Sequence, residues 1–207
     1  IADILFGTPS PVAIETNMGV LKEDQVNIIV HGHEPNLFES MVASVAEPTL
    51  IQAAKDAGAK GLNLVGMCCS GLEMFSRHGT PHAGNFMSTE TVLVTGAVDA
   101  MVVDVQCIKQ ALAQVAECYK TQLITTNPRA RIEGAKHIEF HEDTPKECTD
   151  EIVIQAIGRF KNRGVEVEIP QIVNTGVHGF SHEYINYMLG GTFRGSYTPL
   201  NDNIING

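Results

Sequence analysis

The sequence predicts an α/β protein with a Rossmann-like, doubly wound parallel sheet and helices on both faces, that is, three αβα layers. Short apolar runs rich in β-branched residues recur along the chain, and a loop and a stretch of helical periodicity follow most of them. Runs that are apolar at every position are typical of parallel strands buried on both faces. The predicted strands are residues 26–30, 62–66, 100–105, 123–126 and 137–140.

The helices that alternate with these strands are indicated by the spacing of apolar residues. Residues 37–57 are expected to be helical, with a break at Pro48 because proline disrupts the helical hydrogen bonding. A further helical stretch follows "MCCSG". The next helix, residues 108–119, places its apolar residues on one face at helical spacing. That face consists of Ile108, Ala111, Leu112, Val115 and Tyr119.

The helix 145–161 carries the clearest start signals in the chain. Thr144 is expected at the N-cap and Pro145 at the first helical position. Glu147 lies where a capping box needs a carboxylate. The predicted buried face consists of Ile152, Val153, Ala156, Ile157 and Phe160.

The chain is predicted to contain one principal domain with an addition at each end. Residues 1–24 are rich in turn residues and are expected to form an irregular leading segment. Residues 25–170 form the Rossmann-like domain, and residues 171–207 are expected to begin a further domain with two helices. The chain starts with Ile1 rather than methionine and ends without a tapering tail. These ends indicate a segment of a larger protein.

Composition excludes several classes of function. The 207 residues carry a formal net charge of −10, which argues against nucleic acid or an anionic membrane as the main partner. No apolar run approaches the roughly 18 residues of a membrane span, and no signal peptide is recognisable. Five cysteines, an odd number with two adjacent, do not resemble a disulfide framework and favour a reducing cytoplasm. Neither G-x-G-x-x-G nor G-x-x-x-x-G-K-[ST] is present.

Three residues of metal-ligand type follow three successive predicted strands. His33 lies three residues after the first, Cys69 three after the second and Cys107 two after the third. Ligands of open parallel sheets bind at the carboxyl ends of the strands. A single cysteine is more often a small buried apolar residue, and this reading is preferred for Cys118 and Cys148 within predicted helices. Three ligand-type residues at equivalent strand ends favour a convergent metal site.

The residue types and spacing limit the kind of metal. Thiolates with imidazole suit zinc, iron–sulfur clusters or other late transition metals. A structural zinc site normally uses a local C-x₂₋₄-C pair, and the adjacent Cys68 and Cys69 are poorly placed to bind one ion together. The three residues are 36 and then 38 positions apart, which fits a large inorganic group that spans several loops.

Five motifs together resemble one known family. "DILFGTPSP", "VNIIVHGHEPNLFES", "GAKGLNLVGMCCSG", "GAVDAMVVDVQCI" and "AECYKTQLITT" are similar, in order, to the anaerobic nickel-containing carbon monoxide dehydrogenases. The resemblance covers essentially the whole chain. It implies a protein of three domains, a helical N-terminal domain followed by two Rossmann-like domains. These residues would form the middle domain and the start of the third.

The resemblance also implies roles for individual residues. His33 and Cys69 match the ligands of the unique iron of the nickel–iron–sulfur cluster, the C-cluster, and Cys107 matches a thiolate on a cubane iron. The nickel ligand, the other cluster cysteines and the proton-handling residues lie outside this stretch, so no catalytic residue is assigned here. His31 either orients the cluster edge or is a loop histidine bonded to the backbone. Packing is the preferred role of Cys68.

The implied activity is the reversible oxidation of CO with water to CO₂, two protons and two electrons. The electrons pass to a ferredoxin-like acceptor, and further 4Fe-4S clusters are expected outside these residues. The implied assembly is a cytoplasmic homodimer, with membrane association through partners as an open alternative. Nucleic acid is not an expected partner.

Three rival functions are open at this stage. A hybrid-cluster protein of the hydroxylamine reductase type shares the fold, but by family pattern it has a carboxylate at the position of Cys69. A non-catalytic, cluster-binding relative differs at residues outside this sequence. A zinc hydrolase would need a nearby general base, for which Glu34 and Asp104 are the candidates.

Overall fold

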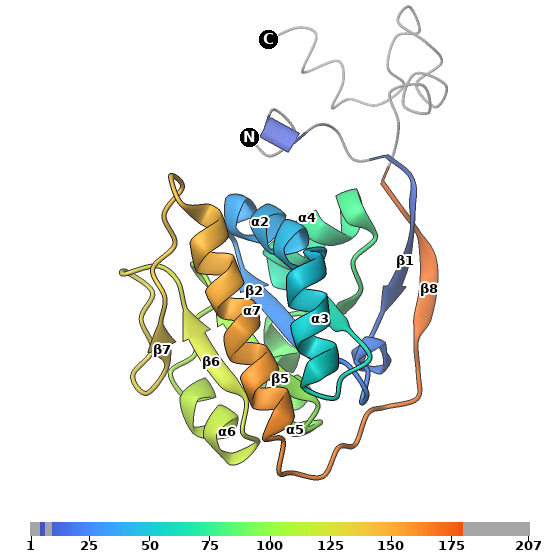
Figure 1. Ribbon diagram of the computed structural model, residues 1–207. Coiled ribbons are helices and arrows are strands. Elements are labelled where there is room, and N and C mark those ends of the chain that lie inside the picture. Colours follow the sequence, from blue (N-terminus) through green and yellow to red (C-terminus); the bar gives the residue numbers. More distant parts are fainter. Residues whose placement is uncertain (1–4, 7–9, 180–207) are drawn as a thin grey trace, which may run out of the picture.

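The eight strands of the computed structural model form one mostly parallel sheet (Figure 1). The structure describes residues 5–6 and 10–179. The strand order is β7-β6-β5-β2-β3-β4-β1-β8, and all pairs are parallel except β1 with β8. The strands are β1 Val12–Thr16, β2 Val26–Gly32, β3 Leu62–Met67, β4 His82–Gly84, β5 Val98–Val103, β6 Gln122–Thr125, β7 Lys136–His137 and β8 Asn174–His178.

Helices cover both faces of the sheet, so the predicted α/β class with three αβα layers is confirmed. The helices α2, α3 and α7 lie over one face (Figure 1), and α4 adds Met74 to the same core. The helices α5 and α6 cover the opposite face. The bounds are α2 Pro35–Val45, α3 Pro48–Asp56, α4 Cys68–His78, α5 Thr89–Val94, α6 Leu112–Cys118 and α7 Pro145–Lys161, with 3₁₀ turns η1 Met18–Val20 and η2 Phe86–Ser88.

The side chains of β2 divide between two hydrophobic cores. Ile28 and Val30 belong to the core under α2 and α7, whereas Ile29 between them belongs to the core under α5 and α6. All seven residues of β2 are buried. Each fully buried aliphatic side chain of this size contributes about 1.5–3 kcal/mol to folding. Alternate burial on both faces fixes the register of β2, because a slip of one residue would exchange the two sets.

Several elements differ from the sequence expectations. The leading segment, expected to be irregular, contributes β1, and neither β4 nor β8 was predicted. These strands have little apolar pattern because β4 is short, β1 is half-exposed and β8 is exposed. The predicted strand 137–140 is reduced to β7. The two helices predicted near the C-terminus fall mainly within residues 180–207, outside the described residues.

The helical predictions are confirmed in part. The break before Pro48 separates α2 from α3, and α7 has the predicted bounds with Pro145 in its first turn. The side chain of Thr144 makes no cap hydrogen bond, so the predicted capping box does not form. Helix α6 begins only at Leu112, because residues 108–111 belong to the loop that leaves β5.

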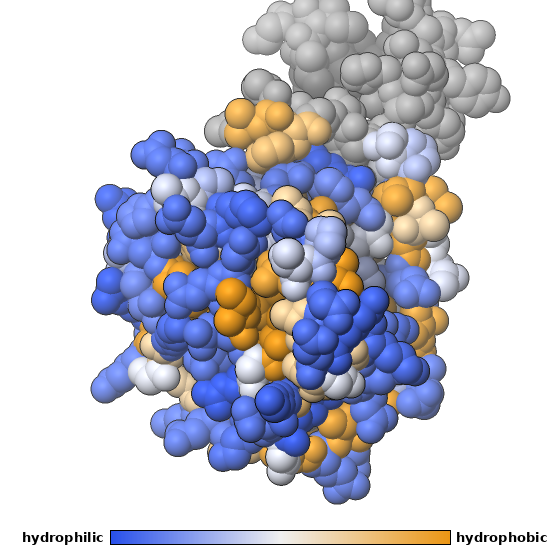
Figure 2. Space-filling view, viewed as in Figure 1, coloured by the Kyte–Doolittle hydropathy of each residue, from blue (hydrophilic) through white to orange (hydrophobic). Residues whose placement is uncertain are grey.

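The edge of the sheet at β8 is exposed and carries apolar residues. Every residue of β8 is exposed, and apolar atoms are visible along the edge formed by β1 and β8 (Figure 2). Ile172 and Val177 are among the exposed large apolar residues. In the part of the chain that the structure describes, no helix has the length and hydrophobicity to cross a membrane.

A buried ion pair closes the end of the sheet where β5 begins. The guanidinium of Arg163 donates to both carboxylate oxygens of Asp99, at 2.6 and 3.1 Å. The backbone N–H of Asn27 donates to the same carboxylate at 2.8 Å. Burial raises the pKa of Asp99 to about 6, while Arg163 and the Asn27 hydrogen bond oppose the shift. Arg163 therefore keeps a costly buried carboxylate ionised.

We expect Arg163→Met to destabilise the protein by about 3 kcal/mol at pH 8, because removal of one partner leaves a buried charge unpaired. The loss should be smaller at pH 5. Without Arg163 the folded-state pKa of Asp99 rises further above its unfolded value. The loss of stability relative to the wild type therefore grows as the pH rises from about 6, the pKa of Asp99 with Arg163 present, toward the higher pKa of the variant. Urea unfolding at both pH values measures the effect. Arg159→Met, at an exposed arginine of α7, is the control; an equal, pH-independent loss in both variants would contradict the expectation.

Candidate metal centre

The three predicted ligands lie at one edge of the sheet, where the neighbouring strands β5, β2 and β3 end. Beyond β2 and β3 an isolated parallel bridge joins Gly32 to Cys68. His33 and Cys69 are therefore the next residues on two adjacent backbones. Beside them, the backbone N–H of Asp104 donates to the carbonyl of His31 at 3.1 Å and continues the pairing of β5 with β2. The loop that carries Cys107 leaves the sheet from this point.

The distances from the strand ends differ from the sequence expectation. Strand β2 extends through Gly32, so His33 follows it directly. Cys69 is the second residue of α4, two after the end of β3, and Cys107 lies four after the end of β5. His33 and Cys69 are exposed, and Cys107 is half-buried. The shared edge is confirmed, whereas the predicted spacings of three, three and two residues are replaced by one, two and four.

The remaining cysteines divide differently from the prediction. Cys148 is buried in α7. Cys118 is exposed, so its prediction as a core residue is wrong. The reason is the shortness of α6, whose buried side is made by Leu112 and Ala116 and leaves the last residue facing outward. The Cys148 thiol donates to the carbonyl of Ile138, the residue that follows β7, at 3.9 Å.

Backbone strain is concentrated in the loops of the candidate site. Cys68, Gln106 and Cys107 have φ values of 57°, 60° and 50°. Only Asn17 and Lys120 share a positive φ among the other described non-glycine residues. It costs about 1 kcal/mol or more for a residue with a side chain, and such strain is found disproportionately at functional sites. The loops that carry Cys69 and Cys107 thus hold unfavourable conformations.

A buried carboxylate links the three loops. Asp104 Oδ1 accepts hydrogen bonds from the backbone N–H groups of His33 and Val105. The hydroxyl of Ser70, next to Cys69, donates to Asp104 Oδ2 at 2.8 Å. The backbone N–H of Glu34 donates to Ser70 Oγ at 3.1 Å. Burial raises the pKa of Asp104 to about 6, and these hydrogen bonds oppose the shift.

Gly32 makes room for this carboxylate. Its φ of +139° is outside the range that residues with a side chain readily adopt. A Cβ at this position would overlap Asp104 Oδ1. Glycine is therefore required for both backbone and steric reasons, and the close approach brings β2 against the end of β5.

His31 is a buried residue of β2 rather than a loop histidine, so the loop interpretation is wrong. Its Nε2 lies 3.0 Å from Thr89 Oγ1, which itself donates to the carbonyl of Phe86 at 2.8 Å. Nε2 therefore carries the proton that Thr89 accepts, and Nδ1 is left buried without a partner among the described residues. Burial lowers the pKa of His31 to about 4, which keeps the ring neutral.

Cys68 is buried beside the candidate ligands. Its Sγ lies 3.9 Å from His31 Nε2. Burial, reinforced by the neighbouring Cys107 thiol, raises the pKa of Cys68 to about 12. The thiol is therefore protonated at neutral pH, which agrees with its predicted packing role. Cys69 and Cys107 are the accessible sulfur donors.

The donor set suits a polynuclear group better than a single ion. Among the described residues, no three His, Cys, Asp or Glu side chains converge closely enough to hold one metal ion. Imidazole and thiol donors instead leave three adjacent strand ends, and such soft donors are typical ligands of iron–sulfur clusters. The residues fit a cluster that bridges several loops and do not fit a mononuclear zinc hydrolase site.

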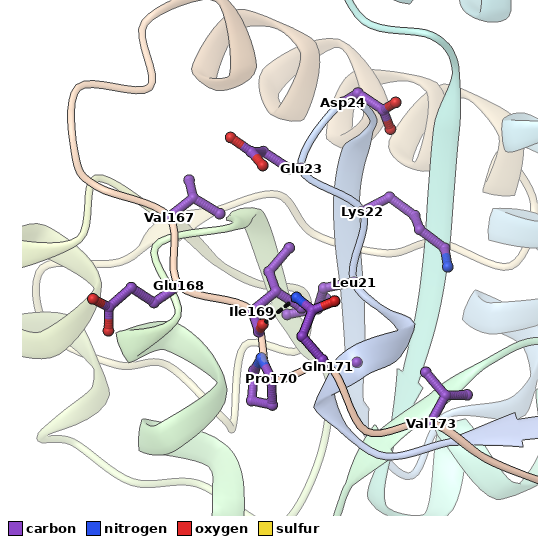
Figure 3. Close-up of a pocket in the computed structure, with 11 residues that line it drawn as sticks. Leu21, Lys22, Glu23, Asp24, Val167, Glu168, Ile169, Pro170, Gln171 and Val173 are labelled. Atoms are coloured by element: carbon purple, nitrogen blue, oxygen red, sulfur yellow. Dashed lines mark hydrogen bonds between the residues drawn. The ribbon is translucent and has the colours of Figure 1, made fainter.

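A separate hollow lies at the opposite end of the sheet, between the segment before β2 and the chain that follows α7 (Figure 3). It has a volume of about 1140 Å³. Leu21 and Ile169 lie near its centre, and Lys22, Asp24 and Glu168 lie around it (Figure 3). No histidine or cysteine is among the described residues that line it. The hollow therefore offers none of the donors found at the strand-end edge.

Comparison with known proteins gives consistent matches. The model of the Prismane/CO dehydrogenase family matches residues 1–207. Carbon monoxide dehydrogenase 1 of Methanosarcina mazei is 48% identical over 208 residues, which cover 100% of this chain and 32% of the relative. The carbon monoxide dehydrogenase of Rhodospirillum rubrum is 41% identical over 209 residues, 100% of this chain and 33% of the relative. The chain spans about a third of the length of these relatives.

Solved structures show the same fold. The as-isolated, nickel-free carbon monoxide dehydrogenase from Thermococcus sp. AM4, produced without the CooC maturase, is 48% identical with a TM-score of 0.88. The match covers 93% of this chain and 30% of that one. Carbon monoxide dehydrogenase IV from Carboxydothermus hydrogenoformans is 49% identical with a TM-score of 0.86, over 99% of this chain and 32% of that one.

The cysteine environments predict a pattern of alkylation in the metal-free chain. At pH 8 iodoacetamide should modify Cys69 and the control residue Cys118 readily, because both are exposed. Burial raises the pKa values of Cys68 and Cys148 to about 12 and 11. Their alkylation rates should therefore be lower than those of the exposed thiols by a factor of roughly 100 or more. Fragment mass spectrometry distinguishes the adjacent Cys68 and Cys69. Equal rates at these two residues would contradict the described burial.

Proposed function

Because the chain belongs to the Prismane/CO dehydrogenase family, we propose that it is part of the catalytic subunit of an anaerobic carbon monoxide dehydrogenase. The proposed reaction is the reversible oxidation of CO with water to CO₂, two protons and two electrons. Identities of 41–50% to proteins named carbon monoxide dehydrogenase, over the whole chain, support this activity. The observation that carries the proposal is the exit of His33, Cys69 and Cys107 from three adjacent strand ends.

The proposed cofactor is the nickel–iron–sulfur C-cluster. His33, Cys69 and Cys107 would hold it, with further ligands and additional 4Fe-4S clusters outside these 207 residues. When bound, the cluster would supply the redox-active metal site at which CO is oxidised. The soft donor types, their partial exposure and the absence of a closed single-ion set among the described residues support this assignment.

The residues around the proposed ligands hold them and control their surroundings. Asp104 and Ser70 fix the backbone at His33 and next to Cys69. Buried Met67 and Val103 close the sheet beneath the loops and exclude water from that side. His31 adds a neutral ring rather than a cation, because its pKa lies near 4. The chain thus holds thiol and imidazole donors in fixed positions above a buried, apolar part of the sheet.

The wider assignments follow from the proposed activity. We propose residues 25–170 as the main part of the middle Rossmann-like domain. The leading segment 1–24 and the segment 171–207, proposed to begin the next domain, add the strands β1 and β8 to its sheet. The proposed electron acceptor is a ferredoxin-like protein, the proposed assembly is a homodimer, and the proposed compartment is the cytoplasm. The net charge of −10 supports the exclusion of nucleic acid as a partner.

A hybrid-cluster protein of the hydroxylamine reductase type is the alternative function. It is favoured less because Cys69 offers a thiol where the pattern of that family has a carboxylate. The two activities are separated by one assay of the purified full-length protein under anaerobic conditions. CO-dependent reduction of a viologen dye supports the proposal, whereas hydroxylamine reduction without CO oxidation would replace it with the alternative.

The two histidines of the H-G-H motif should differ in their effect on iron content. His33→Ala in the full-length protein is expected to lose the iron that His33 would bind, together with CO oxidation. His31→Ala should retain most of its iron, because the His31 ring is engaged by Thr89 inside the core. Iron per chain, measured by plasma mass spectrometry, checks this. Loss of iron from His31→Ala with normal iron in His33→Ala would reverse the assignment.

Cysteine variants test the ligand set against the other thiols. Cys69→Ala and Cys107→Ala should abolish CO-dependent dye reduction, because the cluster loses an anchor. Cys148→Ala should be active with a stability loss of about 1 kcal/mol, since a small buried group is removed. Cys118→Ala should change neither property, because the thiol is exposed. An active Cys69→Ala enzyme with normal iron content would refute the site assignment.

A further inference from the structure

The two ends of β5 carry buried aspartates in contrasting surroundings. Both Asp99 and Asp104 are at most 2% exposed. Asp99 is neutralised by Arg163 at 2.6 Å. In the part of the chain that the structure describes, Asp104 has no such ion pair, and the groups bonded to its carboxylate are hydrogen-bond donors. The charge of Asp104 is therefore stabilised by fixed dipoles alone.

These donors belong to the loops of the three proposed ligands. One is the backbone N–H of His33 itself, 71 residues away in the sequence. A second is the backbone N–H of Val105, two residues before Cys107. A third is the hydroxyl of Ser70, adjacent to Cys69 and 34 residues away. A buried charge without a cation is an expensive way to stabilise a fold, because apolar packing would cost less. The buried Asp104 carboxylate at the strand ends therefore indicates that the positions of these loops must be fixed.

We propose that Asp104 is the positioning residue of the metal centre, whose carboxylate sets the spacing of the His33, Cys69 and Cys107 backbones before metal is inserted. Gly32 and Ser70 serve the same purpose. Gly32 leaves room for the carboxylate, and the Ser70 hydroxyl connects the carboxylate to α4. The inference rests on the proposed function for the identity of the group that these loops receive. The spacing of the loops is a property of the chain itself.

An amide cannot replace this carboxylate. Oδ1 accepts two N–H groups and Oδ2 accepts the Ser70 hydroxyl, so both oxygens act as acceptors. In Asp104→Asn one of them becomes an NH₂ group, which directs hydrogens at a donor. If the amide nitrogen faces Ser70, the hydroxyl must rotate to find a new acceptor while still accepting from Glu34. At least one of the three hydrogen bonds is then lost or reversed, with little change in side-chain volume.

The test compares Asp104→Asn with Asp99→Asn in the full-length protein, by nickel and iron per chain and by amide hydrogen exchange of the metal-free form. We expect Asp104→Asn to lose at least five-fold in nickel and to exchange roughly ten-fold faster in peptides covering residues 31–34 and 104–107. Asp99→Asn should lower the thermal midpoint and retain metal and slow exchange in these peptides. Normal metal content and unchanged exchange in Asp104→Asn would overturn the proposal.

A milder pair keeps the test decisive if Asp104→Asn does not fold. Ser70→Ala removes one donor to Asp104, whereas Ser76→Ala removes a comparable buried hydroxyl from the same helix. We expect Ser70→Ala alone to lose nickel and to alter the electron paramagnetic resonance spectrum of the reduced metal centre, at a thermal midpoint matching that of Ser76→Ala. Equal metal content and spectra in the two serine variants would count against the positioning role.

Failure of the proposed function is distinguishable from failure of this inference. A wild-type protein without nickel or an iron–sulfur cluster would refute the proposed function. The hydrogen exchange of the metal-free forms would still decide whether Asp104 spaces the loops. Conversely, a wild-type enzyme that oxidises CO, together with an Asp104→Asn variant that keeps full nickel and slow loop exchange, would leave the function in place and refute the positioning role.

Discussion

Backbone donors that emerge at the end of a buried parallel sheet must find acceptors, because no further strand continues the ladder. In this chain β5, β2 and β3 end side by side, and the carboxylate of Asp104 accepts the N–H groups of His33 and Val105. The Ser70 hydroxyl extends the same arrangement to α4. Much of the geometry of the candidate centre depends on this one acceptor, since the His33 loop, the start of α4 and the start of the Cys107 loop are all bonded to it directly or through Ser70.

The two cores make such an arrangement possible. Ile28 and Val30 anchor β2 to one helical layer, and Ile29 anchors it to the other, so the strand cannot slide. With the strands fixed, the loop residues can occupy unfavourable left-handed conformations at Gln106 and Cys107. Packing of the two cores thus compensates for the strain in the loops at the strand ends, and the donors face outward from fixed strands.

The apolar runs were sufficient to predict the central strands, because burial on both faces leaves a strong pattern. The helices α2, α3 and α7 were predicted from helical spacing of apolar residues, Pro48 and the start signals at Pro145. Strands β1 and β8 could not be predicted, since their residues are half-exposed or exposed and their pairing partners are distant in sequence. The shared edge of His33, Cys69 and Cys107 followed from the prediction of a parallel sheet, whose strands have their carboxyl ends at one edge. The role of Asp104 did not, because its hydrogen bonds reach residues 34 and 71 positions away and leave no local pattern.

The contact between Gly32 and Asp104 imposes an order on sequence change. Any side chain at position 32 collides with the carboxylate at position 104, so a mutation at position 32 cannot come first without breaking the loop contacts. A mutation at position 104 would remove the collision, but the backbone at position 32 would still have to leave its φ of +139° before another residue could be accepted. Two successive barriers therefore separate this pair from any alternative pair. Drift at the two positions should be slow and strongly coupled, whatever group the loops carry.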